Sequence, residues 1–62
     1  MNTKKVKKPS NFGTALFIAE NFGLDVKDEA IKKIAVDMNL KPNVLIKNYK
    51  SVVIMITTLN QL

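Results

Sequence analysis

Lysine side chains are the residues of this chain with the clearest chemical capacity. Ten of the 62 residues are basic, all of them lysine, against five acidic residues, so the net charge is +5. Seven of the ten fall in two runs that hold no acid, one at the start of the chain and one in its second half: Lys4, Lys5, Lys7, Lys8, Lys41, Lys47 and Lys50. This distribution suits a polyanionic partner, either a nucleic acid or an anionic membrane surface. A basic tail that only aids solubility is the alternative interpretation.

Catalytic and metal-binding patterns are missing from the sequence. The chain has no histidine and no cysteine, which removes disulfides and the usual zinc ligands. A nucleophile–base pair would therefore need Lys, Asp or Glu, and the acids stand at expected helix starts or on one outward face. Gly13 and Gly23 are isolated, so no glycine-rich phosphate loop is present. We expect no enzyme, no metal and no cofactor.

Length and hydropathy limit the fold to one small domain. A core built from 62 residues is only marginally stable alone. Because the chain has 47% hydrophobic residues and no disulfide, we expect oligomerisation to supply the additional stability. No apolar run follows the N-terminal lysines, so no secretory signal is predicted. The most apolar segment, residues 52–56, is shorter than the roughly 20 residues that span a bilayer. We expect a cytoplasmic protein without a membrane segment.

Residues 1–9 are predicted to form a flexible basic arm, and residues 10–62 a single helical domain. Ser10 or Asn11 is suited to cap a first helix that runs from about Phe12 to Phe22, where Gly23 supplies the left-handed residue that ends it. Five apolar residues at helical spacing mark its inward face, with Ile18 beside them: Phe12, Ala15, Leu16, Ala19 and Phe22. Phe17 is also interpreted as a packing residue, like the other two phenylalanines and Tyr49.

A second helix is predicted after Asp25, a candidate N-cap. Asp28 and Glu29 then fall in its first turn, where acids interact favourably with the helix dipole. Spacings of three and four place five residues on its inward face: Ala30, Ile31, Ile34, Ala35 and Met38. Asn39 tolerates a positive φ and is expected to end this helix.

The third helix is predicted to begin at Pro42, whose missing N–H is harmless in a first turn. An unbroken apolar stripe extends it to about Asn60: Leu45, Tyr49, Val52, Ile56 and Leu59. Residues 52–58, "VVIMITT", are rich in β-branched side chains and could instead form a strand. The regular spacing favours the helix.

The junction of these two helices has the features of a helix-turn-helix. Ala35 is a small residue for a close helix crossing, Asn39 can take the turn conformation, and Leu40 and Leu45 are apolar on either side. At this point "IAVDMNLKPNVLIKNY", residues 34–49, resembles the DNA-binding domain of LuxR-type regulators and the fourth region of bacterial sigma factors. Lys41 stands where those families have a capping Ser or Thr. The resemblance implies that the helix from Pro42 is a recognition helix.

If Leu45 and Tyr49 are buried, the opposite face of the third helix turns outward. Lysines on that face suit phosphates or guanine edges, Asn43 suits adenine, and Ile46 suits a thymine methyl. Without arginine, affinity per subunit is expected to be modest and strongly salt-dependent. A solvated lysine face is the alternative. The predicted DNA-binding residues are Lys41, Asn43, Ile46, Lys47 and Lys50, with Lys4, Lys5, Lys7 and Lys8 of the arm.

The end of the third helix has more apolar surface than its own core needs. We expect a helix with this excess apolar surface to be covered by a partner, either a second copy or another protein. We expect a homodimer through Val52, Val53, Ile54, Met55, Ile56 and Leu59. The sequence thus predicts an all-α, three-helix helix-turn-helix domain with an extended C-terminal helix, acting as a small sequence-specific transcriptional regulator without an effector domain. The alternative is a helical adaptor or inhibitor that docks into another protein through this helix.

Overall fold

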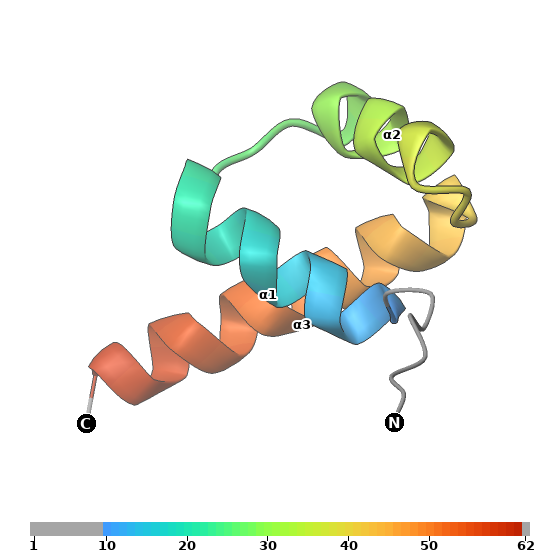
Figure 1. Ribbon diagram of the computed structural model, residues 1–62. Coiled ribbons are helices and arrows are strands. Elements are labelled where there is room, and N and C mark those ends of the chain that lie inside the picture. The colour runs from blue at the N-terminus through green and yellow to red at the C-terminus, as the bar shows by residue number, and fades with distance from the viewer. Residues whose placement is uncertain (1–9, 62) are drawn as a thin grey trace, which may run out of the picture.

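The computed structural model describes residues 10–61 and has an all-α fold. It contains three helices, α1 (Asn11–Phe22), α2 (Asp28–Asp37) and α3 (Pro42–Asn60). The longest, α3, is the platform on which both other helices pack, whereas no pair of Cα atoms within 8 Å joins α1 to α2 (Figure 1). One core lies between the three helices. Its buried hydrophobic members are Ala15, Ile18, Ala19, Ile31, Ala35, Leu45, Tyr49 and Val52.

The start of α1 follows the predicted capping chemistry. Ser10 has an extended backbone, and its Oγ accepts a hydrogen bond from the Gly13 N–H at 2.9 Å, which satisfies one free donor of the first turn. The helix turns the side chains of Thr14, Ala15, Ile18 and Ala19 inward. Three of these four are small, so α1 lies close to α3.

The prediction that the phenylalanines of α1 fill the core was wrong. Phe12, Phe17 and Phe22 are 42% to 61% exposed. The inward face is centred near Ile18 rather than on the stripe of larger side chains, so Phe12 lies beside it and Phe17 opposite. Phe22 occupies the last turn, where its ring and that of Phe17 form an edge-to-face pair with centroids 6.4 Å apart.

Gly23 ends α1, although not in the left-handed helical conformation that the sequence suggested. Its N–H donates to the Ala19 carbonyl at 3.2 Å, and its backbone has φ 106° and ψ −178°. This combination of positive φ and extended ψ is essentially restricted to glycine. The chain therefore leaves α1 in an extended direction toward α2.

The second helix begins later than predicted. Its N-cap is Lys27, without a side-chain hydrogen bond, rather than Asp25. The Val26 N–H donates to the hydroxyl of Tyr49, a contact that helps to hold the chain before Lys27 in a loop. Asp28 and Glu29 occupy the first turn as expected.

Two of the five predicted inward residues of α2 are exposed. Ile31 and Ala35 are buried and Ile34 is half-buried, but Ala30 and Met38 are exposed. Because the backbone of α2 comes close only to that of α3, a narrow stripe of the helix is enough for the contact. Ala30 lies beside this stripe, and Met38 lies beyond the last helical residue.

The turn between α2 and α3 is formed as predicted. Asn39 is the one non-glycine residue with positive φ, 60°, among residues 10–61. The N–H of Leu40 donates to the Ala35 carbonyl at 2.7 Å, and the N–H of Asn39 to the Val36 carbonyl at 3.1 Å. These two bonds form a Schellman motif, in which the last carbonyls of α2 find backbone donors. Leu40 is half-buried against the core, as its place after the turn predicted.

Pro42 is the first residue of α3, and the helix is continuous through residues 52–58, which excludes the strand alternative. Leu45, Tyr49 and Val52 are buried, and Ile56 is half-buried. Leu59, the last residue of the predicted stripe, is 64% exposed because the C-terminal turns of α3 extend past α1 (Figure 1). None of the helices within residues 10–61 has the length and apolarity that crossing a membrane requires.

Candidate nucleic-acid interface

The first half of α3 presents a basic and polar face. Lys41, at the N-cap, and Asn43 and Lys47, within the helix, are all exposed. Asn43 and Lys47 are four residues apart, so they lie above one another on the same side of the helix. No acidic residue occurs between Pro42 and Asn60, so nothing on α3 itself neutralises these lysines. We call Lys41, Asn43 and Lys47 the basic face of α3.

The start of α3 adds peptide donors to this face. Lys41 provides no side-chain cap, and the first turn contains no acid. Pro42 has no N–H, so the exposed donors of the turn come from the residues that follow it. Unsatisfied N–H groups at a helix start favour an anion, and the adjacent lysines act in the same direction.

Lys50 is oriented differently from the other predicted contacts. Its Nζ lies 3.7 Å from Oδ2 of Asp28 at the start of α2, and both side chains are more than half exposed. Surface pairs of this kind contribute between zero and about 1 kcal/mol, so Lys50 can leave Asp28 at little cost. Sequence reasoning missed the pair because its members are far apart in the chain.

Ile46 does not belong to the basic face. It is half-buried and packs against the core, whereas the sequence predicted an outward position suited to a thymine methyl. The packing of α1 and α2 on α3 widens the buried stripe until it includes this neighbour of Leu45. Val44, which the sequence did not single out, is 37% exposed and is the apolar side chain next to Asn43. The remaining predicted contacts, Lys4, Lys5, Lys7 and Lys8, lie outside the described residues.

Tyr49 holds α3 in place by more than packing. Its ring is 3% exposed, and its hydroxyl donates to the Gly23 carbonyl at 2.7 Å and accepts from the Val26 N–H at 3.0 Å. The hydroxyl therefore fixes the loop between α1 and α2 to the middle of α3. No local signal in the sequence could reveal this role, since both partners are more than 20 residues away.

The second half of α3 presents an apolar face. Ile54, Met55 and Leu59 are 48% to 65% exposed, and Val53 is half-buried. Val52 is completely buried in the core of its own chain, so it has no surface left for a second copy. One helix thus has a basic exposed face in its first half and an apolar one in its second half.

Binding is the chemistry that these residues can perform. Across residues 10–61, no three acidic side chains come together in a way that would hold a metal ion. Lysine ammonium groups, an amide side chain and peptide N–H groups donate hydrogen bonds to anionic or carbonyl oxygens. Comparison with models of protein families, with curated proteins and with solved structures gives no match to this chain.

Proposed function

We propose that this chain is a small DNA-binding protein of the helix-turn-helix class, acting as a sequence-specific transcriptional regulator without an effector domain. The observation that supports it is the turn at Asn39, followed directly by a helix whose exposed first half carries Lys41, Asn43 and Lys47. In helix-turn-helix proteins, the first residues of the second helix contact base edges in the major groove. The resemblance over residues 34–49 supports the same assignment.

Each residue of the basic face has a distinct role in this proposal. Lys47 and Lys41 neutralise backbone phosphates, together with the lysines of the arm, and the exposed N–H groups of the first turn of α3 approach a phosphate. Asn43 pairs with an adenine edge, and the neighbouring Val44 contacts a thymine methyl in place of Ile46. Tyr49 and Leu45 contact no DNA and hold α3 against the domain.

The second half of α3 supplies a homodimer in the same proposal. Two copies would place two recognition helices on one duplex, and the apolar side chains Ile54, Met55 and Leu59 are exposed at the end of the same helix. The same exposure favours a second candidate function, an adaptor that docks into another protein's groove. The two candidate functions differ in whether they need the lysines, since only the DNA-binding function requires the basic face.

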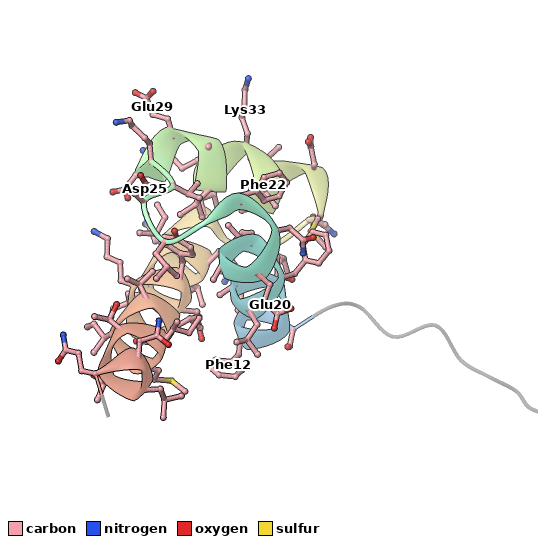
Figure 2. All side chains as sticks on the ribbon, turned by 90° about the vertical axis from the view of Figure 1, so that its left-hand side faces the viewer. Phe12, Glu20, Phe22, Asp25, Glu29 and Lys33 are labelled. Atoms are coloured by element: carbon pink, nitrogen blue, oxygen red, sulfur yellow. The ribbon has the colours of Figure 1, made fainter. Side chains whose placement is uncertain are left out.

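A fluorescence-anisotropy titration on mixed genomic DNA fragments, at two salt concentrations, tests the proposed function. Lys47→Ala should weaken binding and reduce the slope of log affinity against log salt by about one, because one phosphate contact is lost. Lys33→Ala is the matched control: it removes the same charge from an exposed side chain that points away from the body on the outer side of α2 (Figure 2). The control should change the slope less.

Sequence specificity is tested with Asn43→Ala on a selected DNA site and on random DNA. The variant should lose affinity for the selected site and keep its affinity for random DNA, because base-edge contacts carry the sequence information. Deleting residues 1–8 should weaken binding to both DNAs about equally. A folded protein without DNA affinity even at low salt, or equal effects of Lys47→Ala and Lys33→Ala, would overturn the proposed function.

A further inference from the structure

A second apolar surface lies between α1 and α2, on a part of the molecule that the proposed DNA contacts do not use. It is a cleft of about 420 Å³, and we call it the α1–α2 cleft. Phe17, Ile18 and Phe22 line it from α1, Ile34 from α2, and Met38 from the residue after α2. Its volume is within the range of pockets that hold a ligand or inserted side chains, roughly 300–1,000 Å³.

The α1–α2 cleft is open because the two helices that form it do not pack on each other. Each is attached to α3 instead, and the aromatic rings of Phe17 and Phe22 remain more than half exposed at its edge. None of the residues that line the cleft carries a charge. An occupant must therefore be uncharged, since burying a charge here would leave it without a partner, and the mostly apolar lining favours an apolar one.

The end of α3 has the complementary properties. Ile54, Met55 and Leu59 are exposed in the second half of α3, whose C-terminal end extends past α1 (Figure 1), and we call this apolar strip the α3 ridge. From Ser51 to Leu62 the sequence contains no charged residue. The α3 ridge can therefore enter an apolar cleft without burying a charge. A contact made through this ridge would also keep the lysines of the two positively charged copies out of the interface.

We propose that the α3 ridge of one copy inserts into the α1–α2 cleft of a second copy, and that the two copies exchange ridges about a two-fold axis. This arrangement covers the α1–α2 cleft and the α3 ridge at once. A ridge and a cleft are different patches, so their contact closes into a dimer only when it is made twice. The proposal rests on the homodimer in the proposed function and names the surface that receives α3.

The area that a stable dimer needs favours reciprocal exchange over a single insertion. Stable interfaces bury about 800 Å² on each partner, which is about a sixth of the 4691 Å² surface of this chain. Three side chains of one ridge supply only part of this area. When both copies give a ridge and receive one, each contributes two patches, and the buried area doubles.

Complementation between two variants tests this arrangement in the absence of DNA, so its failure is distinguishable from failure of the DNA-binding function. Phe17→Asp damages the cleft and Ile54→Asp damages the ridge, each at a side chain more than half exposed. Sedimentation of the full chain at tens of micromolar should show a wild-type dimer and, for each variant alone, an association at least about tenfold weaker. An equimolar mixture of the two variants should regain part of the dimer, because the pair retains one intact ridge and one intact cleft.

Three results overturn the proposal: a monomeric wild-type chain, a Phe17→Asp chain that dimerises like wild type, or a mixture that associates no better than its components. The second would place α3 against α3 of the other copy. Lys33→Ala, on the outer side of α2, lowers the net charge by the same one unit and should leave the dimer unchanged (Figure 2).

Should a variant fail to fold by circular dichroism, cross-linking decides the question. The chain has no cysteine, so Phe17→Cys and Leu59→Cys chains of different length can be mixed and joined with a short bifunctional thiol reagent. We expect the mixed product between positions 17 and 59. A product between two copies of position 59 instead would overturn the exchange.

Discussion

The turn between α2 and α3 and the loop between α1 and α2 each contain one residue with positive φ, but different parts of the molecule hold them. At the turn, the N–H groups of Asn39 and Leu40 donate to carbonyls of the helix that has just ended. At the loop, the Tyr49 hydroxyl reaches from α3 to the Gly23 carbonyl and the Val26 N–H. The turn is thus a local structure, whereas the loop depends on the tertiary fold.

This difference matters for the proposed function because the two connections position α3 differently. The turn sets where α3 begins, and so where Lys41 and Asn43 lie relative to α2. The Tyr49 contacts fix the middle of α3 to the chain between α1 and α2. Damage at Tyr49 should therefore affect the whole domain, and damage at Asn39 should chiefly affect the entry of α3.

The largest effect is expected at Tyr49. Tyr49→Ala removes a buried ring and its hydroxyl, at a cost of about 3–5 kcal/mol in the free energy of unfolding. Tyr49→Phe keeps the ring and leaves the Val26 N–H and the Gly23 carbonyl without their partner, at a cost on the order of 1–3 kcal/mol. Urea denaturation followed by circular dichroism measures both. If Tyr49→Phe is as stable as wild type, the loop does not depend on α3.

The same contrast explains how much of the fold was predictable from sequence. Helix ends governed by neighbouring residues were predicted correctly: Ser10, one of the two candidate caps, caps α1, Asn39 ends α2 and Pro42 begins α3. The start of α2 was not, since the Tyr49 hydroxyl binds the Val26 N–H and helps to hold the chain beside Asp25 in a loop. A hydrogen bond between residues 23 positions apart leaves no local pattern.

The side chains of the candidate site also divide into those whose exposure follows from helical periodicity and those whose exposure depends on the tertiary fold. Asn43 and Lys47 are exposed as predicted, because burial of Leu45 and Tyr49 places them on the opposite side of one helix, and Lys41 is exposed at the N-cap. The width of the buried stripe depends on how α1 and α2 pack beside α3, and helical periodicity does not contain that information. Ile46 at the margin of the stripe and Phe12 beside the inward face of α1 were misplaced for this reason.

A smaller effect than that of Tyr49→Ala is expected at Gly23. Gly23→Asn places a side chain where φ is 106° and ψ is −178°, a conformation essentially confined to glycine, and should cost on the order of 1–3 kcal/mol. A Cβ at this position would lie 3.5 Å from Oδ1 of Asp25, an ordinary contact, so the cost arises from the backbone and not from crowding. Thermal denaturation should show a clearly lower midpoint. A midpoint like that of wild type would mean that the loop leaves α1 in another conformation.

The smallest effect is expected at Asn39. Here asparagine can be replaced by glycine without strain, whereas replacing glycine by asparagine at Gly23 strains the backbone. Asn39→Gly should change the free energy of unfolding by no more than about 0.5 kcal/mol, because glycine adopts φ 60° without strain and the side chain is exposed. Asn39→Val, a β-branched residue in the left-handed region, should cost about 1–2 kcal/mol. Because the strain lies at the entry of α3, Asn39→Val should also weaken DNA binding at temperatures where the domain is still folded, whereas Asn39→Gly should not. Thermal melts and anisotropy titrations of both variants measure the two effects. Equal behaviour of Asn39→Val and Asn39→Gly in both assays would show that the turn conformation does not position α3.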